Sequence, residues 1–158
     1  MSNDAFVSST REIRAPLPHV RSLAIRLETV MSWIWAPAQV ADPAASRDLP
    51  NGTRQLIVRD GDKLRTRVAE QEERRVVIEA VYQPRNTDVP GRELRYELNL
   101  EVGAGTTMAT LSLHFAEPPS ENPGEIRRWT RNLRQCLDRL DELAAGEVNE
   151  AQGAEGDA

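Results

Sequence analysis

The chain has 158 residues, enough for one domain with its own hydrophobic core and too few for two. It contains 39% hydrophobic and 28% charged residues, which is typical of a globular protein. No apolar run approaches the ~20 residues of a membrane span, and the polar N-terminus lacks a signal-peptide core. The protein is therefore expected to be cytoplasmic. A net charge of −5 argues against binding to nucleic acid or to an anionic membrane, and a single cysteine, Cys136, excludes an internal disulfide and a cysteine-based zinc site.

The first predicted elements are a strand and a helical region. Residues 6–13 are expected to form the strand, and Pro16 and Pro18 both end it and open a helical turn. Apolar side chains then recur at helical spacing, and two further prolines end this region, so two short helices are predicted here. The apolar positions are Val20, Leu23, Leu27, Val30 and Ile34. A polar loop is expected to follow, up to residues 50–52.

From residue 53 onward the apolar pattern has a period of two, which is typical of strands with one buried face. Asp60-Gly61-Asp62 and Gly103-Ala104-Gly105 indicate tight turns between strands. Strands are therefore predicted over residues 54–59, 63–70, 75–83, 92–102 and 106–116. The clearest alternation lies within residues 92–102, where one face carries Leu94, Tyr96, Leu98, Leu100 and Val102.

A long amphipathic helix is predicted over residues 122–145. Asn122 is expected to be its N-cap, Pro123 its first residue and Glu125 the acid of a capping box, while Gly146 is expected to end it. Its apolar face carries Ile126, Trp129, Leu133, Cys136, Leu137, Leu140, Leu143 and Ala144. The predicted division is a flexible N-terminus (1–4), a single domain (5–146) and a disordered acidic tail (147–158).

This order of elements predicts an α+β architecture in which the helix packs on the apolar face of an antiparallel sheet. Three motifs add to that prediction: Ile13-x-Ala15-Pro16 with Val20 after the first strand, Asn51-Gly52-Thr53 before the hairpins, and Leu140-x-x-Leu143 near the end of the last helix. In these motifs the chain resembles the START-like, helix-grip (SRPBCC) superfamily, and within it polyketide cyclase/dehydrase-like or chaperone-ATPase-activator-like bacterial proteins.

The resemblance implies a particular form of the α+β fold. A curved antiparallel sheet of six or seven strands would wrap around the long C-terminal helix, and two short helices would follow the first strand. It also implies a cavity between sheet and helix that commonly binds an apolar ligand.

Such a cavity would be lined by inward-facing strand residues and by the apolar face of the helix. The residues predicted to bind a ligand are Trp33, Trp35, Tyr82, Tyr96, Leu98, Leu113, Trp129 and Leu133. The alternative is that these side chains fill a dry core, because protein interiors pack densely. Tyr82 and Tyr96 differ from the rest because a buried phenol needs a hydrogen-bond partner, in a ligand or in a loop at the sheet rim.

Catalytic and metal sites are not predicted. His19 and His114 have no acid or nucleophile at a spacing that would form a dyad, and His114 is expected to point away from the core. Cys136 is expected to be a small buried apolar residue, and Arg139 to lie on the outer face of the helix. No cofactor is expected.

A basic stripe on the last helix is formed by Arg127, Arg131 and Arg134. It is expected either to be a solvated face with surface ion pairs or to bind an anion or dock a partner.

These observations favour the binding of a small hydrophobic or amphipathic molecule in a cavity between the sheet and the C-terminal helix. One alternative is a cyclase- or hydrolase-like enzyme that uses Tyr82, Tyr96 or Arg54 to polarise a ligand carbonyl. Another is a protein-interaction module that uses the basic stripe or the outer face of the sheet. The expected partner is therefore a small apolar or amphipathic molecule, with a protein partner as an alternative.

Overall fold

The computed structural model describes residues 5–34, 47–57, 61–86, 88, 91–117 and 122–156. They form one seven-stranded antiparallel sheet and three α-helices, which confirms the predicted helix-grip architecture. The strands are β1 (Val7–Ile13), β2 (Arg47–Leu49), β3 (Thr53–Ile57), β4 (Lys63–Gln71), β5 (Arg75–Gln83), β6 (Arg92–Val102) and β7 (Thr107–Phe115). The helices are α1 (Leu17–Ile25), α2 (Leu27–Trp33) and α3 (Pro123–Gly156), with a 3₁₀ turn, η3, at Pro50–Gly52.

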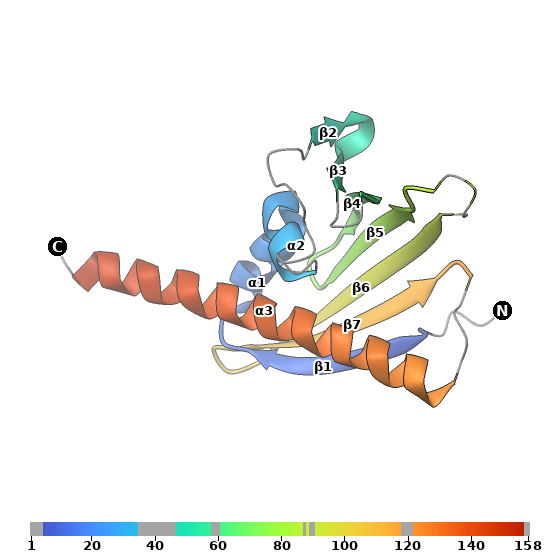
Figure 1. Cartoon of the computed structure of the whole chain (residues 1–158). Coiled ribbons are helices and arrows are strands. Elements are labelled where there is room, and N and C mark those ends of the chain that lie inside the picture. Colours follow the sequence, from blue (N-terminus) through green and yellow to red (C-terminus); the bar gives the residue numbers. More distant parts are fainter. Residues whose placement is uncertain are drawn as a thin grey trace.

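Strands β2 to β7 form a meander, and β1 pairs with β7 to make one edge of the sheet. Its order is β1-β7-β6-β5-β4-β3-β2, and every neighbouring pair is antiparallel. Figure 1 shows α3 running across the sheet close to β1 and β7, with α1 and α2 beside it, next to the middle strands. The hydrophobic core therefore lies between the sheet on one side and the three helices on the other.

In the sheet, the face that packs against the helices is made by every second residue of the longest strands. Every second residue of β7 is buried, from Thr107 to Phe115, and the same holds in β6 from Leu94 to Leu100. Val102 was predicted to continue this face, but 65% of it is exposed, at the last residue of β6. A bulge between Val68 and Glu70 shifts the register between β4 and β5.

A buried carboxylate on α3 fixes the helix to β1. Asp141 has no exposed surface, and it accepts hydrogen bonds from the backbone N–H of Arg14 at 2.9 Å and from Arg11 Nη2 at 3.0 Å. Arg14 Nη2 lies 2.8 Å from the same carboxylate. Because β1 is an edge strand, these contacts set where α3 crosses the sheet.

The two ends of α3 differ in how well they were predicted. Asn122 Oδ1 accepts a hydrogen bond from the N–H of Glu125 at 2.8 Å, which confirms it as the N-cap. The predicted end at Gly146 is wrong, because α3 continues to Gly156 and Gly146 does not have the positive φ of a C-terminal glycine cap. The assignment of residues 147–158 to a separate tail stays a prediction.

At 1.5 Å per residue the 34 residues of α3 span about 51 Å, whereas the 11 residues of β6 span about 37 Å. The carboxyl end of α3 accordingly runs past the sheet in Figure 1. Across the described part of the chain, no helix combines the length and the apolar character needed to cross a membrane.

Candidate ligand-binding site

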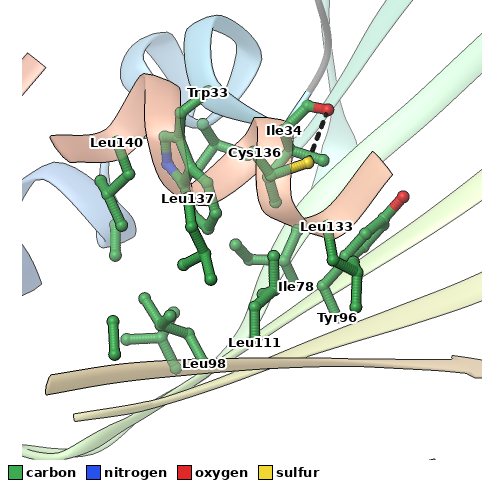
Figure 2. Packing of buried hydrophobic residues seen from close by; sticks show 14 of the residues in the cluster. Trp33, Ile34, Ile78, Tyr96, Leu98, Leu111, Leu133, Cys136, Leu137 and Leu140 are labelled. Atoms are coloured by element: carbon green, nitrogen blue, oxygen red, sulfur yellow. Dashed lines mark hydrogen bonds between the residues drawn. The ribbon is translucent and has the colours of Figure 1, made fainter. Parts of the chain in front are cut away.

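Five of the predicted ligand-binding residues meet in the core between α2, α3 and the sheet. Trp33 comes from α2, Tyr96 and Leu98 from β6, Leu113 from β7 and Leu133 from α3, and each is at most 1% exposed. Figure 2 shows four of them with the α3 side chains facing the strands. The helical and strand periods in the sequence therefore placed Leu133 and the three strand residues on the correct faces, whereas the burial of Trp33 comes from the structure.

Two of the other three predicted residues, Tyr82 and Trp129, pack against the edge of this core. Tyr82 is half-buried, and its hydroxyl donates a hydrogen bond to Asp62 in the turn before β4. Trp129 is half-buried on the first turns of α3, where its Nε1 donates to Glu125 at 3.1 Å. Trp35 lies outside the described residues. Tyr82 and Trp129 therefore belong to the rim of the sheet.

The carboxyl end of α2 is joined to α3 through backbone carbonyls. Arg139 Nε donates to the carbonyl of Trp33 at 3.0 Å, and its Nη2 donates to the carbonyl of Ile34 at 3.3 Å. The thiol of Cys136 donates to that same Ile34 oxygen at 3.5 Å, as Figure 2 shows. Arg139 was predicted on the outer face of the helix, and this is wrong. Its half-buried guanidinium satisfies carbonyls that the end of α2 leaves without an intrahelical partner.

The ionisable groups in this core are held in their neutral forms. Burial raises the pKa of the Cys136 thiol to about 12, although Arg139 beside it acts in the opposite direction. Burial also raises the pKa of Tyr96 well above its usual value, and the nearby thiol of Cys136 raises it further. Neither group is thus activated as a nucleophile or a base at neutral pH, and both interact as neutral groups.

Two buried hydrogen-bond donors in the core have no partner among the described residues. They are Nε1 of Trp33 and Oγ1 of Thr66, and both side chains are fully buried. A buried donor that stays unpaired lowers the stability of the fold by roughly 1–3 kcal/mol. The presence of these two donors therefore needs an explanation. Because α2 contacts β4, the two donors come from neighbouring elements.

Thr66 also lies in a row of small side chains on the inward face of the sheet. It pairs across strands with Ala80, which in turn pairs with Leu94. The flanking rows carry larger side chains, Leu64 with Tyr82 and Val68 with Ile78. Thr66 and Ala80 thus form a row of small side chains between two rows of larger ones, and both are buried. The alternation of β4 predicts that Thr66 faces inward, but only the structure shows that its hydroxyl is unpaired.

The outward face of the sheet carries matched charges. Arg75 binds Glu97 at 2.9 Å and Glu70 at 2.7 Å, and His114 Nε2 lies 3.8 Å from Glu97. His114 therefore points outward, as predicted. Within the described ranges, no three His, Cys, Asp or Glu side chains are close enough together to hold a metal ion.

Comparison with known proteins identifies proteins of the same fold but no family. No protein-family model matches the sequence, and a search of curated proteins finds no significant match. Solved structures do match. An uncharacterised protein from Bacillus thuringiensis has a TM-score of 0.62 and 14% identity over 88% of this chain and 98% of its own. XoxI from Bacillus cereus has a TM-score of 0.62 and 16% identity over 88% of this chain and 94% of its own.

A third similar structure is DynU16, a protein in the dynemicin biosynthetic locus. Its TM-score is 0.57 and its identity 18%, over 86% of this chain and 45% of the DynU16 chain. At these identities the similarity establishes a shared fold alone.

Proposed function

We propose that this protein belongs to the START-like SRPBCC superfamily and binds a small hydrophobic or amphipathic molecule between the sheet and α3. The observation that carries the proposal is the pair of buried, unpaired donors, Trp33 Nε1 and Thr66 Oγ1. A ligand oxygen that accepts from either of them removes the cost of burying that donor. The motifs described above support the superfamily assignment, and the shared fold is consistent with it.

The surroundings of these donors have the composition of a small-molecule site. Such sites are mostly apolar and hold a few directional polar groups. The side chains of the core cluster to which Trp33 belongs are aliphatic or aromatic, and they include Leu98, Leu111, Leu133 and Leu137. The small side chains of Thr66 and Ala80 would let a ligand approach the sheet more closely than the larger side chains in the flanking rows.

Binding is favoured over catalysis by the state of the core ionisable groups. A cyclase or hydrolase that used Tyr96 as a general base would need the phenol to lose its proton near neutral pH. Burial holds the pKa of Tyr96 far above neutral pH, so the phenol stays protonated. Tyr82, the other tyrosine considered for this role, donates instead to Asp62 at the rim.

The experiment compares native and denaturing mass spectrometry of freshly purified protein, followed by titration with the neutral fluorophore Nile red. The proposal predicts a bound small molecule in the native spectrum or saturable Nile red fluorescence at one site. A protein without either would contradict it.

The role of the buried donors is tested with Thr66→Val, which keeps the shape of the side chain and removes the hydroxyl. We expect the affinity for an oxygen-bearing ligand to fall about fivefold, since one hydrogen bond contributes roughly 1 kcal/mol, while the melting temperature is unchanged or higher. Thr110→Val on the outward face is the matched control, and there the ligand affinity should not change. Equal affinity in wild type and Thr66→Val would show that the hydroxyl does not contact the ligand.

A further inference from the structure

Three aromatic rings gather at the end of the sheet where β7 finishes and α3 begins. Phe115 contacts Phe6 with ring centroids 5.3 Å apart and Trp129 with centroids 5.0 Å apart, both in edge-to-face geometry. Figure 1 places the amino end of α3 on the same side of the molecule as the end of β7 and the start of β1. Because Phe115 is 9% exposed and Trp129 is half-buried, the cluster lies between the core and the solvent.

Two arginines lie over this aromatic cluster. The guanidinium carbon of Arg92 is 5.8 Å from the centroid of Phe115, and that of Arg128 is 5.6 Å from the centroid of Trp129. Arg92 alternates in β6 with Leu94 and Tyr96, so it belongs to the inward face of the sheet. It is the first residue of that face, and its strand neighbour is Tyr82 at the rim. Both cations are therefore held where the apolar core opens toward water.

The positive charge at this end is poorly neutralised by the protein. Among the described residues, Arg92 has no carboxylate within ion-pair distance, and Arg128 has only Glu125 at 3.8 Å. Glu125 also accepts the hydrogen bond of Trp129 Nε1. Asp62, near the rim, already accepts the hydroxyl of Tyr82 and the backbone N–H of Arg85.

Two arginines on the outward face of the sheet have closer carboxylate partners. Arg67 pairs with Glu79 at 3.1 Å, and Arg75 pairs with both Glu97 and Glu70. Cations early in a helix also oppose the helix dipole, so the placement of Arg128 does not serve the stability of α3. In a chain of net charge −5, two poorly matched cations over one aromatic cluster indicate an anion-binding position.

We infer that the molecule bound between the sheet and α3 is an anionic amphiphile, whose charged head binds Arg92 and Arg128. Its largely apolar part extends inward past Leu94, where an oxygen on it can accept a hydrogen bond from Thr66 or Trp33. This inference rests on the proposed function. A guanidinium stacked on an aromatic ring keeps its N–H donors free at its edge, and these donors match the oxygens of a carboxylate or a phosphate. The aromatic rings and Leu94 provide the apolar contact for the carbons next to the head.

The test uses three ligands that share a twelve-carbon chain: dodecanoate, dodecyl phosphate and methyl dodecanoate. Each is titrated below its aggregation concentration against protein that carries Nile red, and displacement of the dye gives its affinity. We expect at least one of the two anions to bind about tenfold more tightly than the neutral ester, as charge-assisted hydrogen bonds are stronger than neutral ones. Which anion binds more tightly distinguishes a carboxylate from a phosphate head.

Two substitutions assign the head group to the arginines. Arg92→Gln and Arg128→Gln should each lower the affinity for the preferred anion about tenfold and leave that for methyl dodecanoate unchanged. Arg67→Gln, on the outward face, is the control and should change neither. A melting curve for each variant verifies that it is folded.

The possible failures separate this inference from the proposed function. If Nile red and the ester bind but the anions bind no more tightly, the head-group assignment is overturned and the proposed function stands. The same conclusion follows if Arg92→Gln and Arg128→Gln leave anion binding unchanged or weaken anion and ester binding equally. If neither the dye nor any of the three ligands binds, both the proposed function and this inference are overturned.

Discussion

Asp141 is the residue whose loss should affect the position of α3 most. It is fully buried and accepts hydrogen bonds from Arg11, which lies in β1, and from Arg14, the residue directly after β1. Asp141→Asn keeps the side-chain volume but removes the negative charge that these cations face. We expect the free energy of unfolding to fall by about 3 kcal/mol, at the lower end of the range for breaking a buried pair because both arginines are partly exposed. Urea denaturation followed by circular dichroism measures it.

The neighbouring carboxylate provides the control. Asp138 also contacts Arg11, but its side chain is 52% exposed. Asp138→Asn should therefore change the stability by less than about 1 kcal/mol. Equal effects at the two positions would mean that burial does not strengthen the Asp141 contacts.

Cys136 should be protected from thiol reagents for as long as the protein is folded. The reagent attacks the thiolate, and a pKa of about 12 leaves only about one thiol in ten thousand ionised at pH 8. The side chain is also fully buried under α2. We expect no measurable labelling by iodoacetamide over an hour in buffer, and complete labelling in 8 M urea, as read by intact mass. Fast labelling of the native protein would show that α2 separates readily from α3.

At the scale of elements, the sequence predicted the long strands better than the short ones. The bounds of β5 and β6 agree with the prediction, and in β6 the eleven alternating residues leave little freedom of register. β2 was expected to be part of a loop, and this was wrong. With three residues, two of them exposed, β2 exists through its pairing with β3 rather than through a pattern of its own.

The carboxyl end of α3 offers a direct test of an element boundary. Gly146 lies inside the helix, and a Cβ there would meet no atom within 4 Å. Because glycine costs roughly 0.5–1 kcal/mol relative to alanine inside a helix, Gly146→Ala should raise the helix content and slightly raise the stability. Circular dichroism at 222 nm during thermal unfolding measures both quantities.

Gly105 is the matched opposite case. A Cβ there is equally unobstructed, but the residue has a φ of +75°, a conformation that costs alanine roughly 1–2 kcal/mol. Gly105→Ala should therefore destabilise the protein while Gly146→Ala does not. If Gly146→Ala destabilised it as well, Gly146 would be a helix cap and α3 would end there.

At the scale of the whole molecule, the sequence placed residues on faces, but it could not place the faces against one another. Leu133 and Tyr96 were correctly assigned to the core by their periods. Trp129 shares the α3 stripe, yet it reaches only the rim because α3 crosses the sheet along β1 and β7. Arg139 was misplaced for the same reason. Its partners are carbonyls more than one hundred residues earlier, at the end of α2, and no local spacing indicates them.

The same long-range contacts predict how the fold responds to acid. The pKa of Glu97 is lowered, first by its hydrogen bond from Arg75, and that of Asp62 first by its hydrogen bond from Tyr82. For Asp141, burial raises the pKa, but the hydrogen bonds and charges of Arg14 and Arg11 outweigh burial, so the net shift is downward. All three carboxylates therefore bind protons less readily in the folded chain than in the unfolded one.

A carboxylate with a lowered folded-state pKa stabilises the protein fully above its unfolded pKa, which is about 4 for Asp and Glu. That stability is lost as the pH falls through the folded pKa. We expect the free energy of unfolding to be nearly constant from pH 7 to about 5.5 and to decrease steadily below about pH 4.5. Urea denaturation at a series of pH values measures the curve. Asp141→Asn should flatten it, because the variant has one fewer carboxylate to protonate on unfolding. A wild-type curve that stays level down to pH 3 would show that the contacts of these three carboxyl groups do not lower their pKa values in the folded protein.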